Sequence, residues 1–136
     1  MENADKVFPS YFPENCPPAE ASSENIVLFR VCKDIVPTAE DFLTFYQMNP
    51  ERYKDKIQAY GLSVFPTAED CEKAKSKSPK LREFKGLASG LINEQRGKIL
   101  RTPNKHNPAH ITWWMYEGVD PLEIFESNVK GGVMNE

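Results

Sequence analysis

The chain contains the five-residue string Pro-Thr-Ala-Glu-Asp twice, at residues 37–41 and again at residues 66–70. Each copy follows a β-branched, apolar run of the kind that forms strands, at residues 26–32 and 62–65. A threonine followed by acidic residues is typical of a helix N-cap and first turn. The threonine hydroxyl accepts a hydrogen bond from an unsatisfied N–H group there, and the acidic side chains interact favourably with the positive end of the helix dipole. We therefore expect a strand, a turn and a capped helix twice. Nothing beyond the string matches, so the repeat is interpreted as reused capping chemistry rather than internal duplication.

The two expected helices differ in the face that they bury. Thr38 and Thr67 are predicted to cap them with their hydroxyl groups. The first helix is expected from residue 39 to about 48, with aromatic core residues on one face: Phe42, Phe45 and Tyr46. The second is expected from residue 68 to about 77, with small residues facing the sheet: Ala68, Cys71 and Ala74. Cys71 is therefore interpreted as a core residue rather than a nucleophile.

The second half of the chain changes from helical to alternating periodicity. Residues 87–92 and 98–102 are predicted to form a hairpin, with Gly97 in the connection at positive φ. Residues 110–116 are apolar on both faces, which is typical of a central strand, and residues 122–125 are predicted to form a short strand or a helical turn. This order predicts an α+β fold, a mostly antiparallel sheet of about five or six strands with two capped helices in a single domain.

The length of 136 residues, with 40% apolar and 27% charged residues, is sufficient for one core. Four prolines predict an extended arm over residues 1–25, which docks on its own domain or on a partner. The domain is expected over residues 26–127, followed by a flexible tail over 128–136. No apolar run has membrane-spanning length, the start does not resemble a secretory signal, and three cysteines form no CxxC pair. We therefore expect a cytoplasmic protein with reduced, mostly buried cysteines and no membrane partner.

The charged residues are distributed unevenly. Residues 73–105 hold ten basic and two acidic side chains, whereas residues 1–72 hold six basic and thirteen acidic ones. A basic block in an acidic chain points to an anionic ligand, which could be nucleic acid, a phosphate-bearing small molecule or an acidic protein partner. The alternative is a solvated face, or a block that pairs with the acidic first half. The charge pattern leaves both alternatives open.

Both histidines of the chain lie in the polar segment of residues 102–110. Pro108 interrupts the helix that would align His106 with His110 as metal ligands, so we expect no metal site. His110-Ile111-Thr112 resembles one element of the two-histidine phosphoesterases, but the chain lacks the second element that this family needs. His110 is a candidate base or phosphate donor, with a structural hydrogen-bonding role as the alternative.

Aromatic residues near the basic block provide a further hypothesis. Trp113, Trp114 and Tyr116 have the chemistry to stack on bases, with core packing as the alternative. The candidate ligand-binding residues are those of the basic and histidine-containing segments with one tryptophan: Lys98, Arg101, Lys105, His106, His110 and Trp114. No GxSxG, Walker or GxGxxG motif occurs, so the hydrolase, nucleotide-triphosphatase and Rossmann classes lack their first requirement.

The run Leu28-Phe29-Arg30-Val31, followed by Gly61-Leu62-Ser63-Val64-Phe65 and a helix with Ala74, resembles the opening of small bacterial ADP-ribosyltransferase-like domains of the toxin type. The resemblance covers about forty residues and implies an NAD cleft in which Arg30 holds a phosphate or ribose and Ser63 lines the nicotinamide pocket. Such domains generally use a glutamate on a later strand, and the loosely placed candidates here are Glu117, Glu123 and Glu126. The alternative is that Arg30 pairs with Asp34 or with a carboxylate of the first helix.

These observations favour a small binding or interaction module for an anionic ligand or an acidic partner, without a cofactor. The alternative is an ADP-ribosyltransferase-like enzyme that uses NAD, for which the candidate catalytic residues are Arg30, Ser63 and His110. Nucleic acid and a second copy of the chain are left open as partners. The two interpretations differ in whether these three side chains converge in one pocket.

Overall fold

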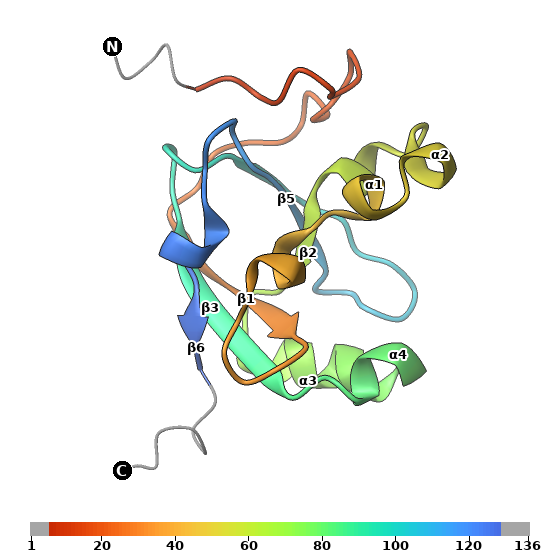
Figure 1. The fold of residues 1–136 in the computed structure, drawn as a ribbon, viewed down its shortest axis with the longest axis vertical. Helices are drawn as coiled ribbons and strands as arrows, with labels where there is room; N and C mark the ends of the chain where they lie inside the picture. The colour runs from red at the N-terminus through yellow and green to blue at the C-terminus, as the bar shows by residue number, and fades with distance from the viewer. Residues whose placement is uncertain (1–5, 129–136) are drawn as a thin grey trace.

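Six strands form two antiparallel sheets of three strands each in the computed structural model, which describes residues 6–128 (Figure 1). In the first sheet, β3 (Gly86–Ile92) lies between β1 (Ile26–Cys32) and β6 (Glu126–Ser127). In the second, β5 (Ile111–Trp114) lies between β2 (Leu62–Val64) and β4 (Lys98–Arg101). The predicted α+β class with mostly antiparallel strands is confirmed, and its six strands are divided between two sheets.

The two sheets are connected at one point of backbone pairing. Phe29 of β1 and Phe65, which follows β2, exchange two hydrogen bonds: Phe29 N–H donates to Phe65 O (2.7 Å), and Phe65 N–H donates to Phe29 O (2.8 Å). Arg30 is the next residue along β1, and Ser63 lies two residues before Phe65 on β2. The sheet junction therefore positions these two residues near each other.

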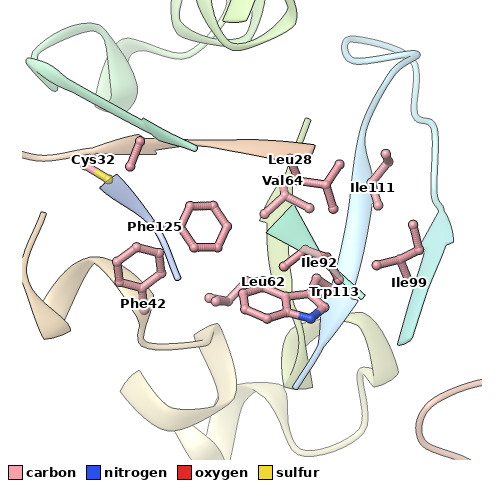
Figure 2. Packing of buried hydrophobic residues seen from close by; sticks show 11 residues of the cluster. Leu28, Cys32, Phe42, Leu62, Val64, Ile92, Ile99, Ile111, Trp113 and Phe125 are labelled. Atoms are coloured by element: carbon pink, nitrogen blue, oxygen red, sulfur yellow. The ribbon is translucent and has the colours of Figure 1, made fainter. Parts of the chain in front are cut away.

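The main core fills the space between the sheets, and Figure 2 shows side chains from both of them pointing into it. Leu28 and Cys32 come from β1, and Trp113 comes from β5; all three are fully buried. Phe125 packs against Trp113 with ring centroids 5.7 Å apart. All four residues of β5 are buried, so the prediction of a central strand there is confirmed.

The second predicted helix is confirmed as α3 (Ala68–Ser76), which a short helix α4 (Pro79–Arg82) follows. The Thr67 hydroxyl accepts from the N–H of Asp70 at 3.0 Å, as expected of an N-cap. Cys71 and Ala74 are buried against the sheet. The face of α3 that packs on the sheet is therefore made of small residues, and its basic residues lie on the rest of the helix surface.

The first predicted helix is wrong as a continuous element. The chain forms a 3-10 turn (η2, Ala39–Phe42), then α1 (Phe45–Met48) and α2 (Pro50–Tyr53). A new N-cap at Thr44 breaks the helix: its hydroxyl accepts from Gln47 N–H (3.1 Å), while the Gln47 side chain accepts from Thr44 N–H (2.9 Å). Phe42 remains in the core, but the break leaves Phe45 47% exposed.

The predicted hairpin is also wrong, because β3 and β4 belong to different sheets. The connection through residues 93–97 carries the chain from the β1 sheet to the edge of the β5 sheet, where Ile99 lies opposite Trp113. Gly97 does adopt a positive φ of 133° in this connection. The segment after Gly118 forms a 3-10 turn (η4, Pro121–Glu123) before β6.

The described part of the arm, residues 6–25, packs on its own domain. Phe8 and Phe12 contact a cluster with Tyr60 and Trp114. Ser22 exchanges two backbone hydrogen bonds with Ile99 of β4 (2.8 and 2.9 Å). Near Tyr60 the chain forms a further 3-10 turn (η3, Ile57–Tyr60). The predicted tail lies outside the described residues except for Asn128.

Two further expectations concern the cysteines and the membrane. Cys16, Cys32 and Cys71 are buried and free, as expected. Within residues 6–128, none of the helices has the length and apolar character that a bilayer crossing requires.

Candidate functional site

A cavity of about 730 Å³ opens where the two sheets meet. Its walls come from the ends of β1 and β2, the segment around α1, the helices α3 and α4, and the loop between β4 and β5. Figure 1 shows this loop extending between the α1–α2 segment and the α3–α4 pair. Arg30, Ser63 and His110 all line the cavity, so the three residues singled out from the sequence are brought together.

Arg30 is directed inward by the alternation of β1. It shares the strand face of Leu28 and Cys32, both fully buried, because side chains two apart point the same way. Its Nε donates to the main-chain oxygen of Asp41 (2.8 Å), and its Nη1 donates to that of Ser63 (2.7 Å). Burial lowers the pKa of the guanidinium from its usual value, while neighbouring acidic groups such as Asp41 oppose this shift.

The ion pair considered for Arg30 does not form. Within residues 6–128 the ion pairs are Lys54–Glu51 and Arg101–Glu24, and the hydrogen bonds of Arg30 go to main-chain oxygens. No acceptor among the described residues reaches Nη2. The guanidinium is therefore positioned by neutral carbonyl groups, and its charge is not balanced by a bonded carboxylate.

Asp41 holds the loop that positions Arg30. Its carboxylate accepts from the backbone N–H of Lys33 and from that of Thr38, each at 2.8 Å. These bonds close the turn between β1 and η2 and leave the Asp41 main-chain oxygen directed at Arg30. The Asp41 carboxylate thus accepts the two backbone N–H groups of the loop, while the Asp41 main-chain oxygen orients the Arg30 guanidinium.

Ser63 and His110 form a hydrogen-bonded pair in the cavity wall. The register of β2 and β5 places Ser63 beside the start of β5, where His110 precedes Ile111. His110 Nε2 lies 2.8 Å from Ser63 Oγ. On the other side of the ring, Nδ1 lies 2.8 Å from Thr102 Oγ1 and 3.2 Å from the Thr102 main-chain oxygen. Both nitrogens of the imidazole are therefore engaged.

These contacts indicate which ring nitrogen carries the proton. In the tautomer with the proton on Nδ1, this nitrogen donates to Thr102 O, because a main-chain oxygen can only accept. Nε2 is then the acceptor for the Ser63 hydroxyl. Burial lowers the pKa of His110 from its usual 6.5, although the backbone bond to Thr102 opposes this shift. Burial therefore favours the neutral imidazole over the charged form.

The remaining walls combine cations with apolar side chains. Lys33, Lys77 and Lys80 join Arg30 around the cavity, and the carboxylates that line it are Glu40 and Asp41. Lys77 Nζ donates to the main-chain oxygen of His106 (2.7 Å) and so connects the end of α3 with the β4–β5 loop. One side of the cavity is apolar and exposed: Leu43 (39%), Phe45 (47%) and Met48 (54%).

The other predicted ligand-binding residues are distributed differently. His106 lines the cavity with His110, whereas Lys98, Arg101, Lys105 and Trp114 are not among its lining residues. Arg101, at the end of β4, forms an ion pair with Glu24 of the arm at 2.9 Å.

The two tryptophans that were considered as a stacking surface are both fully buried. The Nε1 of Trp114 donates to the main-chain oxygen of Ile57 (3.1 Å), and that of Trp113 donates to the main-chain oxygen of Arg96 (3.0 Å). Their ring faces are therefore covered, and their role is the core packing that was the alternative prediction.

The cavity also contains residues that the sequence did not single out. Lys77 and Lys80 belong to the basic block, but nothing in the sequence separated them from its other members. The exposure of Phe45 follows from the capping box at Thr44, a signal that the spacing Thr-x-x-Gln carries. None of Glu117, Glu123 and Glu126 lines the cavity, and Glu40 is the glutamate that does.

Among residues 6–128, no group of three or more histidine, cysteine or acidic side chains is arranged to hold a metal ion. Comparison of the chain with protein-family models, with curated proteins and with solved structures found no match.

Proposed function

We propose that the chain binds a small ligand that carries a phosphate group and an apolar or aromatic portion, in the cavity at the sheet junction. The observation that carries this proposal is the Arg30 guanidinium, which lines the cavity without a carboxylate partner. A charge removed from water is costly unless an opposite charge and hydrogen bonds compensate for it. A phosphate at Nη1 and Nη2 would supply both, because the planar guanidinium suits two-point binding of phosphate oxygens.

The rest of the cavity supports a ligand of this kind. Lys33, Lys77 and Lys80 add positive charge around Arg30. The volume of about 730 Å³ lies within the range of about 300–1,000 Å³ that is usual for small-molecule sites. The exposed Phe45 and Met48 offer an apolar surface for a ring such as a nucleobase. A mononucleotide combines the two required chemistries.

The proposal is tested by calorimetric titration with AMP and with adenosine, which share the base and sugar. We expect AMP to bind and adenosine to bind more weakly, by about tenfold or more, because it lacks the group that Arg30 recognises. Arg30→Lys should lower the AMP affinity by about tenfold, since lysine lacks the planar fork. Arg101→Lys is the matched control, because neither Arg101 nor its partner Glu24 lines the cavity. Equal affinities for AMP and adenosine would contradict the proposal.

A second function has one specific observation in its favour. The resemblance to ADP-ribosyltransferase-like domains implied that Arg30 and Ser63 share a cleft, and both line one cavity with His110. NAD carries the phosphates and aromatic rings that this cavity suits. In this alternative Glu40 takes the place of the expected later glutamate. Nicotinamide release from NAD, measured by chromatography, tests it. Loss of release in Glu40→Gln would support it, and absence of release by the wild type would exclude it.

We further propose that the chain acts in a reducing compartment such as the cytoplasm. Its three cysteines are buried and free, which suits an environment where thiols persist.

An acidic protein partner is an alternative occupant of the cationic surface of α3 and α4. In that case Lys73→Glu and Lys75→Glu, which lie outside the walls of the main cavity, would weaken partner binding and leave AMP binding unchanged.

A further inference from the structure

The contact between Ser63 and His110 has the geometry of a nucleophile and its general base. A serine hydroxyl is a weak nucleophile until a base within hydrogen-bond reach accepts its proton. Here Ser63 Oγ lies 2.8 Å from His110 Nε2, within the range of about 2.6–3.2 Å that such pairs show. Both residues line the cavity, so a bound ligand would lie next to the pair.

A third residue orients the base. Thr102 lies next to His110 across the β4–β5 connection, where Thr102 N–H donates to His110 O (2.9 Å). Its main-chain oxygen and hydroxyl both lie within reach of Nδ1. The hydroxyl is in turn 2.8 Å from Thr112 Oγ1. With the proton on Nδ1, where the Thr102 main-chain oxygen accepts it, the Nε2 lone pair is left for Ser63, which is the arrangement that a base requires.

Arg30 supplies the electrostatic component. Its Nη1 is bonded to the main-chain oxygen of Ser63 itself, so the cation and the hydroxyl belong to adjoining positions of one wall. A phosphoryl group that reacts at Ser63 would therefore place its charged oxygens near the guanidinium. Cations fixed near these oxygens stabilise the charge of a phosphoryl-transfer transition state.

We propose that Ser63 is a nucleophile toward the phosphorus of the bound ligand, with His110 as its general base. The inference rests on the proposed function, because the cavity must first hold a phosphate ester. In the step, the Ser63 Oγ–P bond forms as the bond from phosphorus to the ester oxygen breaks. The Ser63 proton passes to His110 Nε2 and then to the departing alkoxide, which leaves as an alcohol. A water molecule, deprotonated by His110, then attacks phosphorus, and the Ser63 Oγ–P bond breaks as the new O–P bond forms. His110 Nε2 returns the proton to Ser63 Oγ, and inorganic phosphate leaves.

Labelling with diisopropyl fluorophosphate tests the nucleophile without requiring the natural substrate. The reagent forms an Oγ–P bond as its P–F bond breaks, and fluoride leaves. Intact-protein mass spectrometry of the wild type should show one adduct, and peptide mapping should place it on Ser63. Ser78 also lines the cavity but acts as the cap of α4, donating no proton to a histidine, so it should stay unlabelled. An adduct elsewhere, or none, would overturn the proposal.

Three variants test the nucleophile and its base. Ser63→Ala should lose the adduct, and His110→Gln should label more slowly by about a hundredfold, within the usual contribution of a general base. Thr102→Val keeps the main-chain oxygen and removes the hydroxyl, so labelling should slow less than in His110→Gln. Equal labelling rates for the wild type and His110→Gln would overturn the role of His110. Circular dichroism of each variant shows whether it is folded, and the mapping of the wild type stands independently of the variants.

Titration of the same preparations with AMP separates this inference from the function on which it rests. Binding of AMP without an adduct at Ser63 would leave the binding function intact and refute the nucleophile. An adduct at Ser63 without AMP binding would refute the phosphate-bearing ligand as substrate. If AMP binds and Ser63 is labelled, AMP at saturating concentration should lower the rate of Ser63 labelling by about tenfold, because ligand and reagent occupy one cavity.

Discussion

Arg30 donates from Nη1 to the main-chain oxygen of Ser63 at 2.7 Å, so the cation and the hydroxyl of the cavity are held together although they come from different sheets. The bond runs to a carbonyl group, which leaves the Ser63 side chain free to face His110. One residue thus takes part in two contacts with different partners. Substitution of its side chain should disturb the contact with His110 while the contact with Arg30 persists.

Thr67→Ala should destabilise the protein by about 1 kcal/mol, because the substitution removes the acceptor for Asp70 N–H at the start of α3. Thr38→Ala should cost less, since Asp41 N–H is bonded to the Thr38 main-chain oxygen (2.9 Å), which the substitution retains. Urea denaturation measures both values. An unchanged midpoint for Thr67→Ala would contradict the capping role.

Asp41→Ala should weaken ligand binding although its carboxylate is already used by the backbone of the loop. The substitution removes the acceptor of the Lys33 and Thr38 N–H groups and so releases the loop whose carbonyl orients Arg30. We expect a loss of about 1 kcal/mol in stability and about fivefold in AMP affinity. Glu40→Ala is the control, because it removes the neighbouring cavity carboxylate without these bonds. Equal effects of both variants on stability would contradict this role of Asp41.

His110 should make the stability of the protein fall in mild acid. Burial lowers its folded-state pKa below the unfolded value of 6.5, so the unfolded chain binds the proton more tightly. The contribution of His110 is thus fully present above pH 6.5, falls as the pH drops toward the folded pKa, and is constant below it. Thermal unfolding at several pH values measures this. His110→Gln should reduce the difference in melting temperature between about pH 5 and pH 7.

The control for this measurement is His106→Gln, which removes the other histidine from an exposed loop position. We expect this variant to retain the acid destabilisation of the wild type. The same destabilisation in His110→Gln as in the wild type would show that other groups cause it.

Polyanions should bind the basic block only through its charges. Ten basic side chains lie in residues 73–105, and released counterions would make such binding weaken as salt increases. Both tryptophans are fully buried, so a single-stranded oligonucleotide should leave the tryptophan emission unchanged. Fluorescence anisotropy of a labelled oligonucleotide at low and moderate salt measures the first effect. A shift of the tryptophan emission on binding would contradict the second.

Local signals in the sequence predicted the elements that local interactions determine. The limits of β1 and the extent of α3 follow from a β-branched run and from the Thr67 cap. The prediction of the first helix is wrong because the apolar spacing continues past Thr44, where a second cap starts a new helix. The hairpin prediction is wrong because turn residues such as those at 93–97 can connect two paired strands or carry the chain from one sheet to another. The choice between them depends on which distant strand offers a partner, and here that strand is β5.

The candidate site was predictable in its polar centre and not in its walls. An arginine within an apolar strand and a serine on the next strand are conspicuous in the sequence, and the resemblance connected them. Their convergence with His110 depends on the pairing of Phe29 with Phe65, which no local pattern specifies. Lys77 and Lys80 of the cavity wall have the same sequence pattern as other surface lysines, because their contribution depends on the way in which α3 and α4 face the β4–β5 loop.

The N-terminal arm has a consequence for the order of folding during synthesis. Its aromatic side chains are synthesised before the rest of the domain, yet Phe8 packs on Tyr116 with ring centroids 4.8 Å apart. Nearly the whole domain must therefore be translated before these rings find their native contacts, and until then they are exposed to water and to other chains. Contacts between residues far apart in the sequence also slow folding, because a long loop must close before they form. In a nascent chain the aromatic segment of the arm therefore stays uncovered until the segment that follows β5 is available.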